Sequence, residues 1–209
     1  MAIYFPYNNI MNLLSKEHET HKNLMRAFAG ESQARNRYTF ASEIAKQQKM
    51  YVLEKLFLYT ANQEKAHAKV FWDFLKNSKE ELVFIDASYP VDLENDLLSQ
   101  LEKAHLHEYN EFDDVYPSFA NTAEKEGFPA IAYAFREISK VEQQHGDLFQ
   151  YYYNHLKENT LFSGKVAESF VCLNCGHVHS NSDAPKNCPV CNAEQGYFIR
   201  NQQGLPLWI

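Results

Sequence analysis

The chain contains 209 residues, of which 45% are hydrophobic and 22% charged, a composition typical of folded globular proteins and not of disordered ones. Lysine and arginine number 20 against 27 aspartates and glutamates, so the net charge of −7 argues against non-specific nucleic-acid binding and against docking on anionic lipid. No apolar run approaches the roughly 18–20 residues of a membrane span, and the first ten residues lack the features of a signal peptide. We therefore expect a cytoplasmic protein.

Four helices are predicted in the first three quarters of the chain. With only 7 glycines and 7 prolines the sequence favours long helices, and its apolar residues recur at helical spacing. Gly127 and Pro129 suit a helix end and a new helix start, whereas Pro117 should kink the helix that contains it. The expected helices are Ser15–Lys49, Met50–Asn77, Leu93–Lys125 and Pro129–Glu158.

The connections between these helices predict the topology. The first and second helices join almost directly, as do the third and fourth, whereas Lys79–Asp92 is long enough to cross over along the bundle. Two helical hairpins with one long crossover form a ferritin-like four-helix bundle. We place this all-α domain at residues 1–160 and, after a linker at Asn159–Ala167, a small β-rich metal domain at residues 167–209.

Two Glu-x-x-His motifs, Glu64 to His67 and Glu142 to His145, predict a dinuclear metal site. Residues three apart on a helix share one face, so each pair can hold one metal ion. Ferritin-like di-iron bundles add one glutamate from each of the other two helices. Glu31 lies 33 residues before Glu64, and Glu108 lies 34 residues before Glu142, which reveals an internal repeat. Several buried carboxylates are tolerable only with cations between them.

Glu111, one turn after Glu108, has two interpretations. It is either a further ligand or a solvated residue like Asp113 and Asp114, and helical periodicity does not decide between them.

All four cysteines lie in two C-x-x-C motifs separated by 12 residues. Two such turns complete a tetrahedral four-thiolate site, which suits iron or zinc equally by spacing alone. Gly176 can supply the positive φ that the first turn needs. His177 and His179 are expected to be surface residues, because four cysteines already fill the site. The predicted ligands are Cys172, Cys175, Cys188 and Cys191.

Together these motifs make the chain resemble the rubrerythrin family, in which a ferritin-like di-iron bundle precedes a rubredoxin-like domain. The resemblance covers residues 12–201 and leaves residues 1–11 and 202–209 without a motif. The closely related nigerythrins share this architecture and are not separable from the sequence alone. The resemblance to the rubrerythrin family rests on the segments AGESQARNRYTFAS, NQEKAHA, HEYNEFDDVYPSFA, FREISKVEQQH, FVCLNCGHVH and APKNCPVC.

The resemblance implies a role for each site residue. Glu64 and Glu142 correspond to bridging carboxylates, and Glu31, Glu108 and His145 correspond to terminal ligands. Glu111 and His67 correspond to alternative ligands of the first iron, exchanged when the site changes redox state. Tyr38 and Tyr116 correspond to tyrosines that hydrogen-bond the carboxylates. The residues expected to take part in catalysis are thus Glu111, His67, Tyr38 and Tyr116.

The resemblance also implies a function: a non-haem di-iron peroxidase that reduces hydrogen peroxide and protects against oxidative stress. Electrons would come from NAD(P)H through a separate rubredoxin-type reductase and one mononuclear iron held by the four cysteines, with zinc as a possible substitute. The expected assembly is a head-to-tail homodimer or a larger homo-oligomer. Three rival functions remain at this stage: a ferroxidase or iron-storage protein, a di-iron oxidase that uses dioxygen, and a zinc-ribbon interaction module on a structural bundle.

Overall fold

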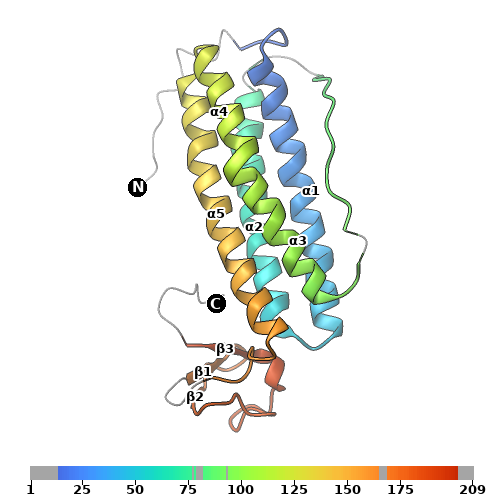
Figure 1. Ribbon diagram of the computed structural model, residues 1–209, viewed down its shortest axis with the longest axis vertical. Coiled ribbons are helices and arrows are strands. Elements are labelled where there is room, and N and C mark those ends of the chain that lie inside the picture. The colour runs from blue at the N-terminus through green and yellow to red at the C-terminus, as the bar shows by residue number, and fades with distance from the viewer. Residues whose placement is uncertain (1–13, 77, 79–81, 93, 165–168, 202–209) are drawn as a thin grey trace.

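The computed structural model describes residues 14–76, 78, 82–92, 94–164 and 169–201, and it confirms an elongated helical bundle with a small sheet at one end (Figure 1). The helices are α1 (Glu19–Gln47), α2 (Tyr51–Lys76), α3 (Leu97–Asn110), α4 (Tyr116–Lys125) and α5 (Pro129–Lys157). Segments 79–81 of the expected crossover and 165–167 of the expected linker lie outside the described residues, as do the two chain ends without a motif.

Local sequence explains where these helices begin and end. The Asp96 side chain accepts a hydrogen bond from the backbone N–H of Ser99 and so caps the start of α3. Lys49 adopts a positive φ of 58° in the tight turn between α1 and α2. Gly127 has a φ of 85° just before Pro129 opens α5, as the sequence predicts.

The third predicted helix is one continuous but irregular helix. Between α3 and α4 lies a π-helical segment, Glu111–Val115, in which the Tyr116 N–H bonds to the Glu111 carbonyl five residues earlier. Pro117 follows at the first turn of α4, where its missing N–H is tolerated. The sequence predicts a kink at Pro117, and the structure has a widened π-helical turn on the N-terminal side of this proline.

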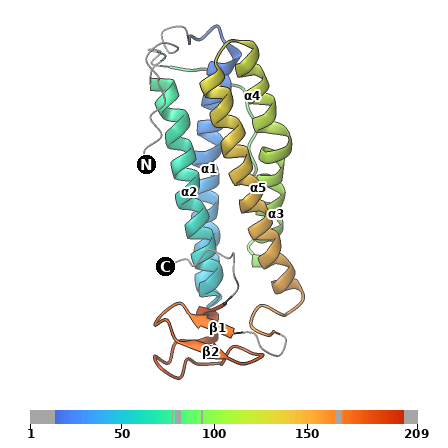
Figure 2. The ribbon, with the colours of Figure 1, turned by 90° about the vertical axis from the view of Figure 1, so that its left-hand side faces the viewer.

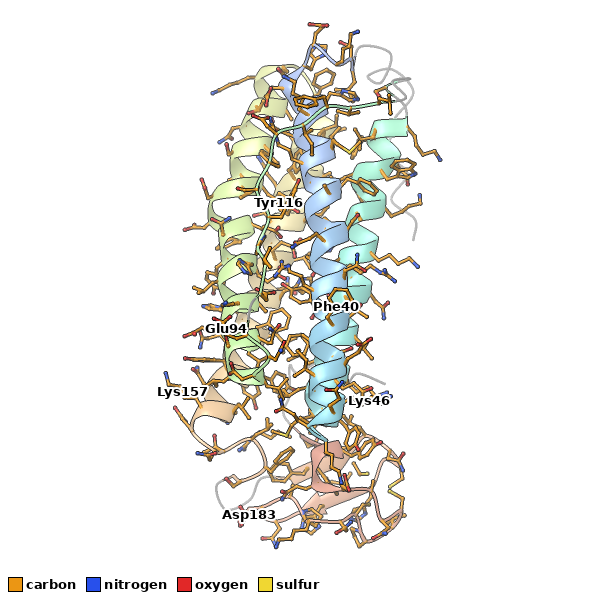
Figure 3. The ribbon with its side chains drawn as sticks, turned by 90° about the vertical axis from the view of Figure 1, so that its right-hand side faces the viewer. Phe40, Lys46, Glu94, Tyr116, Lys157 and Asp183 are labelled. Atoms are coloured by element: carbon orange, nitrogen blue, oxygen red, sulfur yellow. The ribbon has the colours of Figure 1, made fainter. Side chains whose placement is uncertain are left out.

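The helices form two hairpins, since α1 packs mainly against α2, and α3 and α4 pack against α5. The described part of the crossover, residues 82–92, runs along the bundle beside α1 (Figures 1 and 3). No helix in the described part of the chain is both long enough and apolar enough to cross a membrane.

Two apolar clusters fill the bundle, one toward each end. The cluster near the sheet includes Leu53, Phe57 and Phe149, and the other includes Phe71 and Phe135. Along each helix the change from one cluster to the other falls at a predicted metal ligand. A polar layer therefore interrupts the core midway along the bundle. Its carboxylates are Glu31, Glu64, Glu108 and Glu142.

The three strands β1 (Ser169–Cys172), β2 (Val178–Ser180) and β3 (Phe198–Arg200) form an antiparallel sheet in the order β2-β1-β3. The sheet lies at the end of the bundle where α1 meets α2 (Figure 2). Ile199 packs into the neighbouring apolar cluster of the bundle, and the Tyr51 and Tyr197 rings stack with their centroids 4.0 Å apart. We call residues 169–201 the cysteine module; it is packed directly on the bundle.

Candidate metal centres

The two Glu-x-x-His motifs meet in the middle of the bundle, where they form two overlapping groups of side chains. Glu31, Glu64, His67 and Glu142 offer ligand atoms within 4.8 Å of one another, and so do Glu64, Glu108, Glu142 and His145. Glu64 and Glu142 belong to both groups. Two adjacent cation sites that share two carboxylates are the arrangement that a dinuclear centre requires.

The two histidines occupy equivalent places in these groups. His67 Nδ1 lies 2.9 Å from Glu142 Oε1 and 3.1 Å from Glu64 Oε2. His145 Nδ1 lies 2.8 Å from Glu142 Oε2 and 3.0 Å from Glu64 Oε1. Each shared carboxylate therefore turns one oxygen toward each imidazole, and the two groups are related by an approximate twofold repeat.

Two tyrosines tie the hairpins together around this layer. Tyr116 donates a hydrogen bond to Glu31 Oε1, and Tyr38 donates one to Glu108 Oε1. Each hairpin thus supplies a glutamate to the centre and a tyrosine to the glutamate of the other hairpin (Figure 3 shows Tyr116 directed into the bundle). These bonds leave the second oxygen of each glutamate directed to the centre.

The π-helical segment explains why the spacing between glutamate and tyrosine differs between the two hairpins. Tyr38 follows Glu31 by seven residues, about two helical turns, whereas Tyr116 follows Glu108 by eight. One extra residue accommodated between positions 111 and 115 keeps Tyr116 on the same face as Glu108. The same extra residue accounts for the offsets of 33 and 34 between the glutamates of each hairpin.

Burial and mutual repulsion determine the electrostatics of the layer. Glu31 and Glu142 are fully buried, and burial raises the pKa of Glu31 to about 8 even though His67 lies beside it. Burial would lower the pKa of His145, but Glu64, Glu108 and Glu142 outweigh that effect and raise it well above its ordinary value. The layer therefore needs positive charge, which protons or metal ions can supply.

The donor set fits metal ions better than protons alone. Among the described residues, several buried ligand atoms of this centre form no hydrogen bond, although they lie within about 3 Å of one another and buried polar atoms ordinarily find partners. Carboxylate and imidazole together suit iron. These orphaned atoms are Glu31 Oε2, Glu64 Oε1, Glu108 Oε2, both oxygens of Glu142, and His145 Nδ1.

Glu111 lies outside both groups, although it borders them. It is the first residue of the π-helical segment and is only partly buried. Burial raises the pKa of Glu111 well above its ordinary value, and repulsion from the nearby carboxylates, most of all Glu31, raises it further. In this structure His67, and not Glu111, completes the first group.

Gln63 is a contact that sequence reasoning missed. Its Oε1 lies 2.5 Å from His145 Nε2, on the far side of the ring from the carboxylates. An Nε2–H donated to this oxygen orients the ring so that Nδ1 faces the carboxylates, where it can hold either a proton or a metal ion. Gln63 precedes His67 by one helical turn, but this spacing does not mark it as a contact of His145, which lies on another helix.

The four cysteines meet at the predicted second site. Their sulfurs lie within 4.8 Å of one another, and the Cys172–Cys191 and Cys175–Cys188 pairs are 3.8 and 3.7 Å apart. A tetrahedral ion with metal–sulfur bonds of about 2.3 Å requires sulfurs roughly 3.8 Å apart. None of the four forms a disulfide, so this geometry matches a mononuclear metal site.

The two cysteine turns have the same backbone design. Gly176, with a φ of 77°, donates its N–H to the Cys172 carbonyl, and Asn192, with a φ of 62°, donates its N–H to the Cys188 carbonyl. The sequence predicts the positive φ at Gly176 but not the one at Asn192. Asparagine adopts a positive φ more readily than most residues other than glycine, which is why it can take this position. His177 and His179 are half-buried and stand outside the four-cysteine group.

A ferritin-like helical bundle with a two-ion carboxylate centre and an appended four-thiolate module is therefore the class of protein that fold and site define. The family model described as Rubrerythrin matches residues 22–153, and the model described as Rubrerythrin, rubredoxin-like domain, matches residues 170–199. The chain belongs to the rubrerythrin family. Members of this family are di-iron oxidoreductases with a rubredoxin-like domain and a role in oxidative stress.

Individual relatives agree with this assignment. The chain is 42% identical to a rubrerythrin of Clostridium perfringens over 181 residues, which cover 86% of this chain and 93% of the relative. It is 44% identical to rubrerythrin-1 of Clostridium acetobutylicum over 182 residues, with 86% and 93% covered. A solved structure of nigerythrin in a mixed-valence state is similar in fold, with a TM-score of 0.58, 23% identity, and 87% and 86% of the chains covered.

Proposed function

We propose that this chain is a peroxidase that reduces hydrogen peroxide to water. The reaction consumes two electrons and two protons for each peroxide, cleaves the O–O bond and releases two water molecules. The observation that carries the proposal is the pair of overlapping ligand groups that share Glu64 and Glu142. When bound, a pair of ferrous ions supplies both electrons together, which avoids the hydroxyl radical that one-electron cleavage releases.

Most of the proposed ligand roles follow from the grouping, whereas the exchange of His67 with Glu111 rests on the family resemblance. Residues that belong to both groups are proposed as bridging ligands, and residues that belong to one group as terminal ligands. The proposed bridging pair is Glu64 and Glu142, and the proposed terminal ligands are Glu31, Glu108 and His145, with His67 or Glu111 alternating at the first ion. Loss of one carboxylate in favour of a neutral imidazole suits the ferrous state, which carries less positive charge.

Tyr38 and Tyr116 are proposed to hold the terminal carboxylates in place. Burial raises the pKa of both phenols well above the ordinary value, so each keeps its proton and remains a donor at neutral pH. A donor on one oxygen fixes the carboxylate orientation and leaves the other oxygen for the metal. Both side chains are almost fully buried, which also keeps bulk water away from the centre.

Electrons are proposed to arrive singly through iron at Cys172, Cys175, Cys188 and Cys191. A separate rubredoxin-type reductase would draw them from NAD(P)H, since no G-x-G-x-x-G motif for binding a nucleotide is found in this sequence. The family assignment supports a redox partner. Free thiols that bind metal also persist best in a reducing compartment, which supports the cytoplasm.

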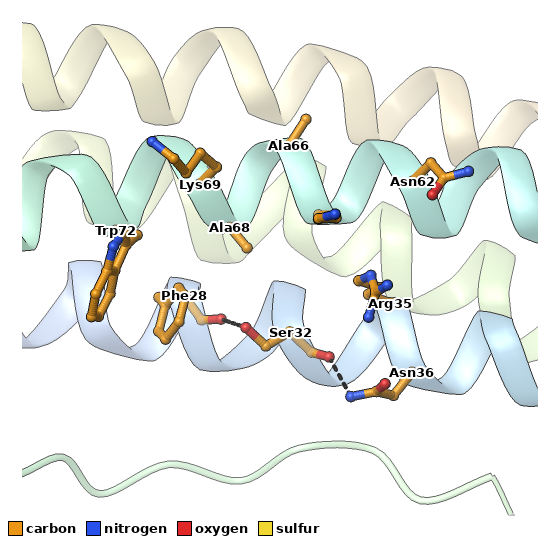
Figure 4. A pocket seen from close by; sticks show the side chains of 10 residues that line it. Phe28, Ser32, Arg35, Asn36, Asn62, Ala66, Ala68, Lys69 and Trp72 are labelled. Atoms are coloured by element: carbon orange, nitrogen blue, oxygen red, sulfur yellow. Dashed lines mark hydrogen bonds between the residues drawn. The ribbon is translucent and has the colours of Figure 1, made fainter.

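The proposed assembly is a head-to-tail homodimer. A groove of about 720 Å³ runs between α1 and α2, where Trp72 keeps 42% of its surface exposed beside Phe28 (Figure 4). Arg35, Lys65 and Lys69 border it, and these cations match a chain of net charge −7. The family resemblance, in which the small domain of one subunit lies beside the bundle of its partner, supports the head-to-tail arrangement.

A coupled assay tests the proposed function. Iron-loaded protein, a rubredoxin reductase and NADH are mixed, and peroxide-dependent loss of NADH absorbance is followed. Cys188→Ser should abolish the coupled activity but leave the di-iron absorption intact, whereas His179→Ala, in the same module but outside the cysteine group, should behave as wild type. NADH loss that needs dioxygen and ignores peroxide would favour an oxidase, and large iron-filled particles in light scattering would favour iron storage.

A further inference from the structure

A cavity of about 230 Å³ joins the surface to Glu111, the carboxylate that stands outside the two ligand groups. Its walls come from α1, from the crossover (residues 82–92) and from the α3–α4 helix with its π-helical segment. Tyr89 from the crossover, Gly30 from α1 and Tyr116 from α4 are among its lining residues. We call this space the Tyr89 cavity. It differs from the groove between α1 and α2, which does not reach Glu111.

Tyr89 and Gly30 lie next to Glu111 in the lining of the cavity. A Cβ atom placed on Gly30 would lie 3.5 Å from Tyr89 Cε1 and 3.9 Å from Glu111 Oε1. The absence of a side chain at position 30 therefore leaves one atom's width between the ring and the carboxylate. The Tyr89 hydroxyl donates a 2.8 Å hydrogen bond to the Arg26 carbonyl, which fixes the ring against α1.

The charges around the cavity are matched. Arg26 pairs with Asp86 at 2.9 Å, and Arg37 pairs with Asp92 at 3.1 Å, so both guanidinium groups that line the cavity have a carboxylate partner. With Glu111 at the inner end, nothing in this lining favours an anion. The chemistry suits a small neutral solute that both donates and accepts hydrogen bonds.

We propose that the Tyr89 cavity is the path by which peroxide reaches the di-iron centre, and that Tyr89 packed over Gly30 is the specificity-determining element that admits hydrogen peroxide and excludes bulky alkyl hydroperoxides. This inference rests on the proposed peroxidase function. The Tyr89 ring limits the width of the path, and Gly30 keeps the path open because it has no side chain. The crossover therefore not only connects two helices but also forms one wall of the proposed substrate channel.

Stopped-flow oxidation of the ferrous protein by hydrogen peroxide and by tert-butyl hydroperoxide tests the inference. Tyr89→Ala should raise the rate with tert-butyl hydroperoxide, relative to hydrogen peroxide, by about tenfold or more. Gly30→Ala should slow both oxidants, the bulky one more. Phe84→Ala removes another aromatic ring from the same crossover; Phe84 is 87% exposed and outside the cavity lining, and this variant should match wild type.

A second readout needs no turnover. The lining disfavours the azide anion equally in wild type and in both variants, so a change in its association rate reports the width of the path. The rate at which azide associates with the ferric protein, followed by absorption, should fall in Gly30→Ala and rise in Tyr89→Ala. Tyr89→Phe, which keeps the ring, should retain wild-type peroxide selectivity, and circular dichroism melting establishes that each variant is folded.

The outcomes separate the two proposals. If wild-type ferrous protein does not react with hydrogen peroxide, the peroxidase function fails, and the azide rates alone then decide whether this cavity is the path. If wild type reacts but neither the peroxide selectivity nor the azide rates change in Tyr89→Ala and Gly30→Ala, the path lies elsewhere and the inference is overturned.

Discussion

Gly196 offers a sharp test of how the cysteine module is held on the bundle, and we expect Gly196→Ala to destabilise the protein. Gly196 is buried, and a Cβ atom there would overlap the Lys49 carbonyl oxygen and lie 2.9 Å from the Lys49 carbonyl carbon. Its φ lies outside the left-handed region, so contact alone forbids the methyl group. Because the obstacle is backbone, no side-chain rotation relieves it, and the module must shift away from the bundle.

The cost of inserting one methyl group into a packed contact is about 1–3 kcal/mol, and an immovable neighbour favours the upper part of that range. For a chain of this size each kcal/mol lowers Tm by about 2–4 °C, so a fall of roughly 5–10 °C is expected. The shift should also separate the stacked Tyr51 and Tyr197 rings.

Calorimetry of the metal-loaded protein measures this effect. Glu194→Gln is the matched control, because it removes only the exposed 2.7 Å ion pair between Glu194 and Lys49 in the same contact and should cost less than about 1 kcal/mol. A Gly196→Ala variant that melts within 1 °C of wild type, a shift worth less than about 0.5 kcal/mol, would refute the reasoning.

Three further predictions concern buried or paired carboxylates. Tyr116→Phe removes the donor to buried Glu31 and should lower the free energy of unfolding in guanidinium by about 1–3 kcal/mol; an unchanged midpoint would contradict this. His107, whose Nε2 lies 3.5 Å from Asp92 Oδ1, and the Arg37 guanidinium lower the pKa of Asp92 to about 2, so the stabilisation from this carboxylate, up to about 2 kcal/mol, is present above pH 4 and disappears as the pH falls through 2. Asp92→Asn should therefore be less stable than wild type at pH 7 but equally stable at pH 2, and a gap that persists in acid would disprove the assignment. Chelation of all metal should lower Tm, since it leaves buried carboxylates to share protons; a Tm independent of metal would count against the fit of the site.

Much of the fold was predictable because its causes are local. Apolar periodicity, the Gly127 and Pro129 boundary and the scarcity of other breakers predict the helices to within a few residues of their observed ends. The clustering of the candidate ligands was predictable for a different reason, since the spacing within each Glu-x-x-His motif and each C-x-x-C turn places both of its side chains together; Glu111, also predicted as a ligand, lies outside the clusters.

The features that sequence reasoning missed depend on contacts between distant segments. Gln63 meets His145 across two helices, and Tyr89 meets Gly30 only because the crossover returns along α1. Helical periodicity also could not reveal the π-helical turn, because one extra residue shifts every later position without breaking the pattern of apolar residues. Its traces in the sequence are the unequal offsets of 33 and 34 between the glutamates and the unequal Glu-to-Tyr spacings of seven and eight.

The central claim is that two electrons pass from the bundle to peroxide and are replaced through the four-cysteine iron. Rapid mixing of anaerobically reduced, iron-loaded protein with either hydrogen peroxide or dioxygen, followed by the visible absorption of the ferric four-cysteine centre, tests it most directly. We expect fast recovery of that colour with peroxide and slow recovery with dioxygen. A faster response to dioxygen, or no colour with either oxidant, would contradict the account.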